Sequence, residues 1–163
     1  MVQVSLRAAN TQDLPDILTV NRQSIPGVTQ LCSRDLVAIL ATAPYFRVAT
    51  VASQVVGYVI GYLAGSPYGG EEFAWFQRRY QTFLYVDQVA VVGHLRGTGI
   101  GAQLYQDVEG WARTRSVPLL TCEVHLSPPN PGSVRFHTRH GYHPVQELDT
   151  TDGRTVILMV KRL

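Results

Sequence analysis

Apolar residues recur along the chain at two periods, and each period is typical of one type of element. Alternation at every second position is typical of a half-buried strand, as where Val2, Val4 and Leu6 alternate with polar residues. Spacings of three and four are typical of a helix that packs on one face. The predicted strands are residues 1–7, 45–52, 55–64, 82–92, 119–126, 142–148 and 154–160. The predicted helices are residues 13–24, 33–43, 71–80, 102–115 and 132–140.

Turn-forming residues separate these stretches. Only residues 53–54 divide the second strand from the third, and an Asp-Gly pair at 152–153 divides the last two, so both pairs are expected to be antiparallel hairpins. Residues 65–81 form an insertion that begins as a glycine- and proline-rich loop and ends as a short aromatic helix. Because no linker interrupts this order, we predict one α+β domain over residues 1–163 with a largely antiparallel sheet.

The composition excludes several classes of function. The chain has 163 residues, of which 45% are hydrophobic, which predicts an ordinary soluble domain. Fourteen Lys and Arg residues against twelve Asp and Glu residues leave a charge of +2, too small for a protein that binds nucleic acid through many phosphates. The only two cysteines, Cys32 and Cys122, are expected to be reduced. Two reduced thiols and no charged-then-apolar leader favour a cytoplasmic protein. No apolar run is long enough for a membrane span.

A glycine-rich turn at residues 96–101 follows the fourth strand and leads into a helix. Gly97, Gly99 and Gly101 allow backbone N–H groups to approach an anion, and the helix directs the positive end of its dipole at the same place. Arg96 can add a charge-assisted contact. The pattern favours a phosphate or pyrophosphate site, and the alternative is a turn that merely contains glycines.

Two common phosphate-binding motifs fit this turn poorly. A P-loop needs a lysine and a hydroxyl residue after its last glycine, where Ala102 and Gln103 stand. Gly97, Gly99 and Ala102 do fit a dinucleotide fingerprint, and Glu123 lies about 20 residues further on, where a ribose-binding acid is expected. That fold, however, requires repeated β-α-β units after the fingerprint, and here one helix remains before the terminal hairpin.

The whole segment from residue 82 to residue 142 resembles the GCN5-related N-acetyltransferase (GNAT) superfamily. The resemblance rests on the strand V-D-Q-V-A-V-V at 86–92, the R-x-x-G-x-G motif at 96–101, and the later residues Asn130, Ser133, His137, Gly141 and Tyr142. Within the superfamily it is similar to small bacterial proteins described as acetyltransferases. It implies a three-layer α/β/α GNAT fold, with helices on both faces of a mixed, mostly antiparallel sheet.

The resemblance also implies a reaction and a cosubstrate. Members transfer an acetyl group directly from acetyl-CoA to an amine, as acyl-CoA-dependent N-acyltransferases (EC 2.3.1.-). The fourth strand binds the pantetheine arm through its main chain, and the turn holds the pyrophosphate. The residues expected to contact acetyl-CoA are Val89, Val91, Arg96, Gly97, Thr98, Gly99, Ile100, Gly101, Asn130 and Ser133. Asn130 is equally suited to a turn before a helix.

Two side chains are candidates for the proton transfers. Glu123 stands where some members carry a glutamate base, and the alternatives are a solvated carboxylate or an arginine partner, with Asp87 in reserve. His137 stands seven residues after Asn130, where members that protonate the thiolate with a tyrosine carry it. Imidazole can donate a proton near neutral pH, but packing or a cofactor contact, with water or Tyr142 as the acid, remains open.

The histidines and Cys122 are not expected to form a metal site or to act as a nucleophile. His125, His137, His140 and His143 do not recur with acidic or cysteine ligands at metal spacing, so we expect no metal. Cys122 is most simply a core residue and not an acyl-carrying nucleophile.

The acceptor is expected to be a small-molecule primary amine, with a peptide N-terminus as the less favoured choice. Aromatic residues of the insertion, with Glu71 and Glu72, would suit a cationic amine. They would equally suit packing on the core or on a second copy in a homodimer. A CoA-binding module without turnover and a dinucleotide-binding protein are the alternative functions.

Overall fold

The computed structural model describes residues 2–163, so Met1 of the first predicted strand lies outside the described residues. The strands are β1 Ser5–Ala8, β2 Tyr45–Val51, β3 Gln54–Leu63, β4 Leu84–Val91, β5 Leu119–Ser127, β6 His143–Asp149 and β7 Thr155–Arg162. The helices are α1 Leu14–Gln23, α2 Ser33–Thr42, α3 Glu71–Arg79, α4 Ile100–Thr114 and α5 Pro131–Arg139, with short 3-10 turns at Thr11–Asp13 and Gly93–Leu95. The predicted order of elements is confirmed.

The strands form one mixed sheet with the hydrogen-bonded order β1-β2-β3-β4-β5-β7-β6. β1 with β2, β2 with β3, β5 with β7 and β6 with β7 are antiparallel, and β4 with β5 is parallel. The predicted α+β class is therefore confirmed. The chain folds as two compact units, of which the first comprises Met1–Tyr62 and Asp87–Gly110 and the second Leu63–Val86 and Trp111–Leu163. The prediction of a single domain stays a prediction.

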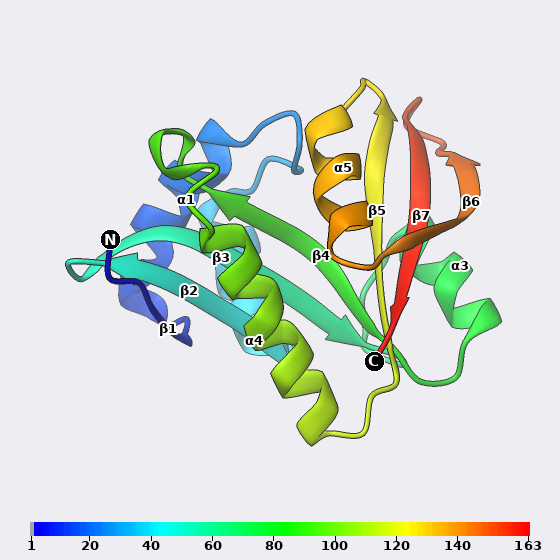
Figure 1. Ribbon diagram of the computed structural model, residues 1–163, viewed down its shortest axis with the longest axis horizontal. Helices are drawn as coiled ribbons and strands as arrows, with labels where there is room; N and C mark the ends of the chain where they lie inside the picture. Colours follow the sequence, from blue (N-terminus) through cyan, green and yellow to red (C-terminus); the bar gives the residue numbers. More distant parts are fainter. Residues whose placement is uncertain (1) are drawn as a thin grey trace. The chain divides into compact units, whose positions relative to one another are not determined.

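In the first unit, helices cover both faces of the β2–β3 hairpin (Figure 1). On one face, the Tyr45 hydroxyl of β2 donates to the Asp107 carboxylate of α4 at 2.5 Å. On the other, the Asn21 amide of α1 donates to the Tyr58 hydroxyl of β3 at 3.0 Å. Asn10 caps the N-terminus of the helical region, because its side chain accepts from the Gln12 N–H. Unit 1 is therefore layered helix, sheet, helix.

Gly57 of β3 lies where its neighbours leave no room for a side chain. A Cβ at this position would lie 2.9 Å from the Ala90 carbonyl oxygen of β4 and 3.5 Å from Leu104 of α4. We expect Gly57→Ala to lower the free energy of unfolding by about 1–3 kcal/mol, because backbone cannot yield cheaply. Gly110→Ala is the control: its Cβ meets open space within α4, so it should stabilise by about 1 kcal/mol. Denaturant unfolding of both variants measures the difference, and an equal response would contradict this packing.

In the second unit, β5 and β7 pair along nearly their whole length, from Leu119↔Arg162 to Ser127↔Thr155. α3 and the strand that follows it share an aromatic core of Phe73, Phe76, Phe83 and Tyr85, each at most 1% exposed. These rings pack at centroid distances of 5.5 to 6.1 Å. For these rings the structure supports the interpretation as core residues.

Both predicted hairpins form, but their turns differ from the prediction. The β2–β3 turn has positive φ at Ala52 (48°) and Ser53 (68°), one residue earlier than predicted. β6 ends at Asp149 and β7 begins at Thr155, so the loop between them is longer than the predicted Asp-Gly pair. The Thr151 N–H and hydroxyl within it donate to the Glu71 carboxylate. The loop conformation therefore depends on a contact with a residue far away in the sequence, and local turn preferences cannot predict such a contact.

Candidate active site

The glycine turn, residues 96–101, lies in the first unit between β4 and α4. Gly97 and Gly99 have φ of +77° and +93°, a conformation that favours glycine. Nothing lies within 4 Å of a Cβ built at either glycine, so both face open space. The Thr98 hydroxyl donates to the Leu95 carbonyl at 2.6 Å and fixes the turn on its inner side. The predicted glycine turn is thus a shaped and exposed backbone loop.

The turn supplies the exposed N-terminus of a long helix. The first intrahelical bond of α4 runs from the Gln103 N–H to the Gly99 carbonyl at 3.0 Å. The N–H groups of residues 99–102 therefore precede the helical hydrogen-bond ladder and can bind an anion. Ile100 is 2% exposed, so it can contribute only its backbone N–H. The arrangement fits a pyrophosphate bound by main-chain amides.

Arg96 has a different set of partners from the one predicted. Its Nε donates to the Val91 carbonyl at 3.0 Å, and its Nη2 donates to the Gln23 carbonyl at 3.1 Å and to the Ser24 hydroxyl at 3.3 Å. The guanidinium therefore links the end of β4 to the C-terminal end of α1. Its predicted contact with pyrophosphate stays a prediction.

Val89 and Val91 occupy alternate positions near the end of β4, both half-buried, beside the buried Gln88 and Ala90. Alternation along a strand places the two valines on one face. Asp87 precedes them at the same spacing and is also half-buried. The predicted main-chain contact of the two valines with the pantetheine arm stays a prediction.

Glu123 lies on β5 in the second unit, half-buried. The Tyr85 hydroxyl donates to its Oε2 at 2.5 Å, and the Tyr85 ring is held among Phe73, Phe76 and Tyr68. Tyr85 stands opposite Thr121 in the parallel register of β4 and β5, two residues before Glu123. A carboxylate fixed by one strong donor keeps an oxygen in a defined direction. The role of Glu123 as the base stays a prediction.

Asn130 and Ser133 lie at the start of α5 and His137 lies in its last turn, all in the second unit. The Asn130 side chain caps the helix by accepting from the Ser133 N–H at 3.3 Å, as its turn preference suggests. His137 is 4% exposed, and its Nδ1 lies 2.7 Å from the Ser133 carbonyl. Because a carbonyl only accepts, the Nδ1 proton is used inside the helix.

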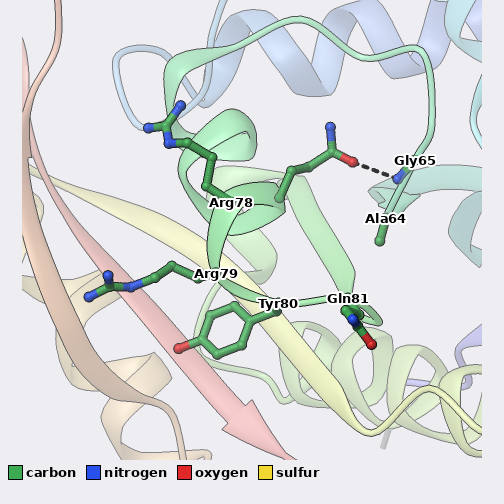
Figure 2. Close-up of a pocket in the computed structure, with 7 residues that line it drawn as sticks. Ala64, Gly65, Arg78, Arg79, Tyr80 and Gln81 are labelled. Carbon is green, nitrogen blue, oxygen red and sulfur yellow. Dashed lines mark hydrogen bonds between the residues drawn. The ribbon is translucent and has the colours of Figure 1, made fainter.

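The carboxylates of the insertion already have protein partners. Glu72 is buried and pairs with Arg154 at 3.0 Å, and Glu71 accepts from Thr151. Both carboxylates are therefore engaged within the protein, and the hypothesis that they attract a cationic amine stays a prediction. At the other end of α3 a pocket of about 480 Å³ opens to solvent (Figure 2). It is lined by Ala64, Gly65, Gln77, Arg78, Arg79, Tyr80 and Gln81.

Comparison with known proteins identifies the family of this chain. The model of the acetyltransferase (GNAT) family matches residues 17–142. The chain belongs to the GNAT acetyltransferase family. A search of the curated proteins finds no match.

Several solved structures share the fold of this acetyltransferase at low sequence identity. Ard1 from Thermoplasma volcanium has a TM-score of 0.82 at 19% identity, with 99% of both chains covered. NAA60 from Arabidopsis thaliana, solved with a bisubstrate analogue, has a TM-score of 0.80 at 18% identity, with 98% of both chains covered. A ribosomal-protein-alanine N-acetyltransferase from Brucella melitensis has a TM-score of 0.73 at 24% identity, covering 98% of this chain and 99% of that one. These likenesses establish the GNAT fold.

The described residues contain neither a metal-binding group of side chains nor a membrane-spanning helix. Among residues 2–163, no three His, Cys, Asp or Glu side chains are grouped so that they could hold a metal ion. None of the helices described is both long and apolar enough to span a bilayer.

Burial determines the charge of His137 in the acetyltransferase. Desolvation lowers the pKa of His137 below its usual value, and the nearby His140 acts in the same direction, while the hydrogen bond to Ser133 opposes both. The ring is therefore neutral near pH 7, with its proton on Nδ1. To serve as an acid, it would have to bind a second proton against the cost of burial.

This lowered pKa predicts a pH-dependent stability. Below about pH 6.5 the unfolded chain protonates residue 137 while the folded protein does not, so the free energy of unfolding falls as the pH drops. Unfolding in urea at about pH 7.5 and about pH 5.5 should show a smaller loss for His137→Gln than for the native protein. His143→Gln, at an exposed position on β6, is the control and should retain the native loss. Equal losses in all three proteins would contradict the assignment.

The predicted site residues fall into two groups. The first unit holds Val89, Val91 and the glycine turn, and the second holds Glu123 and the residues of α5. β4 belongs to both units, because Leu84–Val86 lie in the second and the rest of the strand in the first. Sequence analysis missed Tyr85 as the partner of Glu123. Its position at the start of the predicted glycine-turn strand, one strand from Glu123, was the available signal.

Proposed function

We propose that this GNAT acetyltransferase moves an acetyl group from acetyl-CoA to a primary amine by direct transfer. The observation that carries the proposal is the row of N–H groups at residues 99–102, which precede the helical hydrogen bonds of α4 and follow a strand with two valines on one face. Main-chain amides at a helix N-terminus suit the pyrophosphate of the donor. Val89 and Val91 offer their main chain to the pantetheine arm, and Asn130 and Ser133 of α5 are proposed as further donor contacts.

Glu123 is the proposed base. An amine attacks the thioester only when it is neutral, so a proton must leave it before or during the attack. Glu123 accepts this proton, the nitrogen forms a bond to the acetyl carbon, and the carbon–sulfur bond breaks with its electrons leaving on sulfur. Tyr85 holds the carboxylate in place through its 2.5 Å hydrogen bond. The products are the acetylated amine and CoA.

The proton for the departing thiolate has two candidate sources, His137 and water. The Nδ1 proton of His137 is donated to Ser133, and burial opposes a second proton on the ring. These observations support water as the acid and give His137 the role of fixing the first turns of α5. A His137→Gln variant that keeps its acetyl transfer but loses stability would agree with this assignment.

The acceptor is proposed to be a small-molecule amine, with a peptide N-terminus as the second class. The name of the Brucella relative specifies a protein alanine as its acceptor. At 24% identity that likeness supports the fold and leaves the acceptor to experiment.

Two measurements test the function. Thermal unfolding with CoA, acetyl-CoA and NAD should show stabilisation by the first two only, because a ligand stabilises the state that binds it. Thiol release from acetyl-CoA is then followed over a panel of small amines and N-terminal peptides. Stabilisation by CoA without release for any acceptor would favour a binding module, and stabilisation by NAD alone would favour the dinucleotide alternative. No response to CoA or acetyl-CoA would overturn the proposal.

A further inference from the structure

The side chain of Arg96 is directed at protein acceptors that lie outside the glycine turn. Three hydrogen bonds connect it to Val91, Gln23 and Ser24. Of its nitrogens only Nη1 has no acceptor among the described residues. An arginine that acted by charge on a phosphate would keep more of its fork free for that anion.

The acceptors of Arg96 lie at the ends of two elements. Val91 is the last residue of β4, and the short 3-10 turn Gly93–Leu95 separates it from Arg96. The bond from Nε to the Val91 carbonyl therefore spans this turn and fixes the position of the chain just before Gly97. Gln23 is the last residue of α1, whose final carbonyls have no partner within the helix. Ser24 accepts from Arg96 while its own hydroxyl donates to Val20 of α1 at 2.8 Å. The turn is thus joined to α1 through a continuous chain of hydrogen bonds.

We infer that Arg96 is a positioning residue: it strengthens donor binding by holding the glycine turn against the end of α1, and not by placing its charge on the pyrophosphate. The inference rests on the proposed binding of CoA at this turn. Gly97 and Gly99 have no neighbours within 4 Å of a Cβ, so little else constrains the exposed side of the turn. Binding of a fixed anion by several N–H groups requires that these groups already point together.

Substitutions at Arg96 separate geometry from charge. Lysine keeps the charge and glutamine keeps the ability to donate, but neither reproduces the planar fork that reaches three acceptors. We expect Arg96→Lys and Arg96→Gln to weaken CoA binding by similar factors, roughly tenfold, as the loss of one or two hydrogen bonds would. Arg22→Gln is the matched control, because Arg22 also lies in the last turn of α1 and has no recorded partner in residues 2–163. It should bind CoA as the native protein does.

Ser24 provides the second arm of the experiment, since it lies outside the turn and is not proposed to touch the donor. Ser24→Ala removes one acceptor of Arg96 and should weaken CoA binding about two- to threefold. The double variant of Ser24→Ala and Arg96→Gln should be no weaker than Arg96→Gln alone, because both changes break one chain of contacts. Titration calorimetry with CoA measures the five variants against the native protein. Near-native binding by Arg96→Lys, with no effect of Ser24→Ala, would overturn the inference.

A measurement without ligand keeps this inference separable from the proposed function. Hydrogen exchange of the hydrogen-bonded amides on either side of the turn, those of Leu95 and Gln103, should be faster in Arg96→Gln than in Arg22→Gln, because the turn loses its anchor on α1. If the native protein binds no CoA, the proposed function fails while this comparison still tests the anchor. Unchanged exchange in Arg96→Gln would refute the positioning role even if CoA binds.

Discussion

Replacing Glu123 with glutamine is expected to lower kcat/KM for acetyl transfer by about 10²–10⁴-fold, the usual contribution of a general base. Glutamine has nearly the same shape and can still accept from the Tyr85 hydroxyl, so the strand and the ring cluster should remain in place. What it cannot do is take a proton from the amine. The measurement is thiol release from acetyl-CoA at saturating donor over a range of amine concentrations.

The control for Glu123 is Glu147→Gln on β6, which neutralises an exposed carboxylate of the same unit. It should leave both kcat and KM unchanged. Binding of CoA by Glu123→Gln should also stay within about twofold of the native protein, since Glu123 is not proposed to hold the donor. If activity persists in Glu123→Gln and falls in an Asp87→Asn variant, the base is the reserve candidate on β4.

Hydrophobic periodicity predicted the elements because each of them buries one face. Helical spacing places apolar residues of α1 and α4 on one face of each helix, and in the structure these residues are buried: Ile17 and Val20 in α1, Leu104 and Val108 in α4. Turns followed the pattern less closely, because their conformation depends on what the loop contacts. Thr151 is fixed by Glu71 from an element 80 residues earlier in the chain, and no local preference encodes such a partner.

The candidate site was predictable where chemistry depends on the backbone and less so where it depends on side-chain partners. The glycines predicted a turn whose backbone N–H groups are open to an anion, and in the structure Gly97 and Gly99 adopt the positive φ that few other residues allow. The partner of Glu123 was missed, because Tyr85 reads as one more aromatic residue of a buried strand. Arg96 was assigned to the ligand because a cation beside a phosphate site suggests a phosphate contact, whereas its fork meets three protein acceptors.

Gly99→Val is expected to weaken acetyl-CoA binding by about 100-fold. At φ of +93° a β-branched residue costs about 1–2 kcal/mol, so the backbone will move away from this conformation. That movement redirects the N–H groups of residues 99–102, and each lost hydrogen bond to a charged phosphate is worth about 1.5–3 kcal/mol. Nothing lies within 4 Å of the new Cβ, so the fold itself should survive. Calorimetric titration with CoA and a thermal unfolding curve measure the two effects separately.

Two controls test whether Gly99→Val acts on the binding of the pyrophosphate: a donor that lacks the pyrophosphate, and the same substitution at a glycine outside the turn. Acetyl-pantetheine lacks the pyrophosphate, so Gly99→Val should lower its kcat/KM far less than that of acetyl-CoA. Gly93→Val places the same side chain just before the turn, where the backbone has no positive φ and the Cβ also meets open space. It should bind CoA normally. Equal losses with both donors would mean that the turn supports β4 and does not bind the pyrophosphate, because only a pyrophosphate site distinguishes the two molecules.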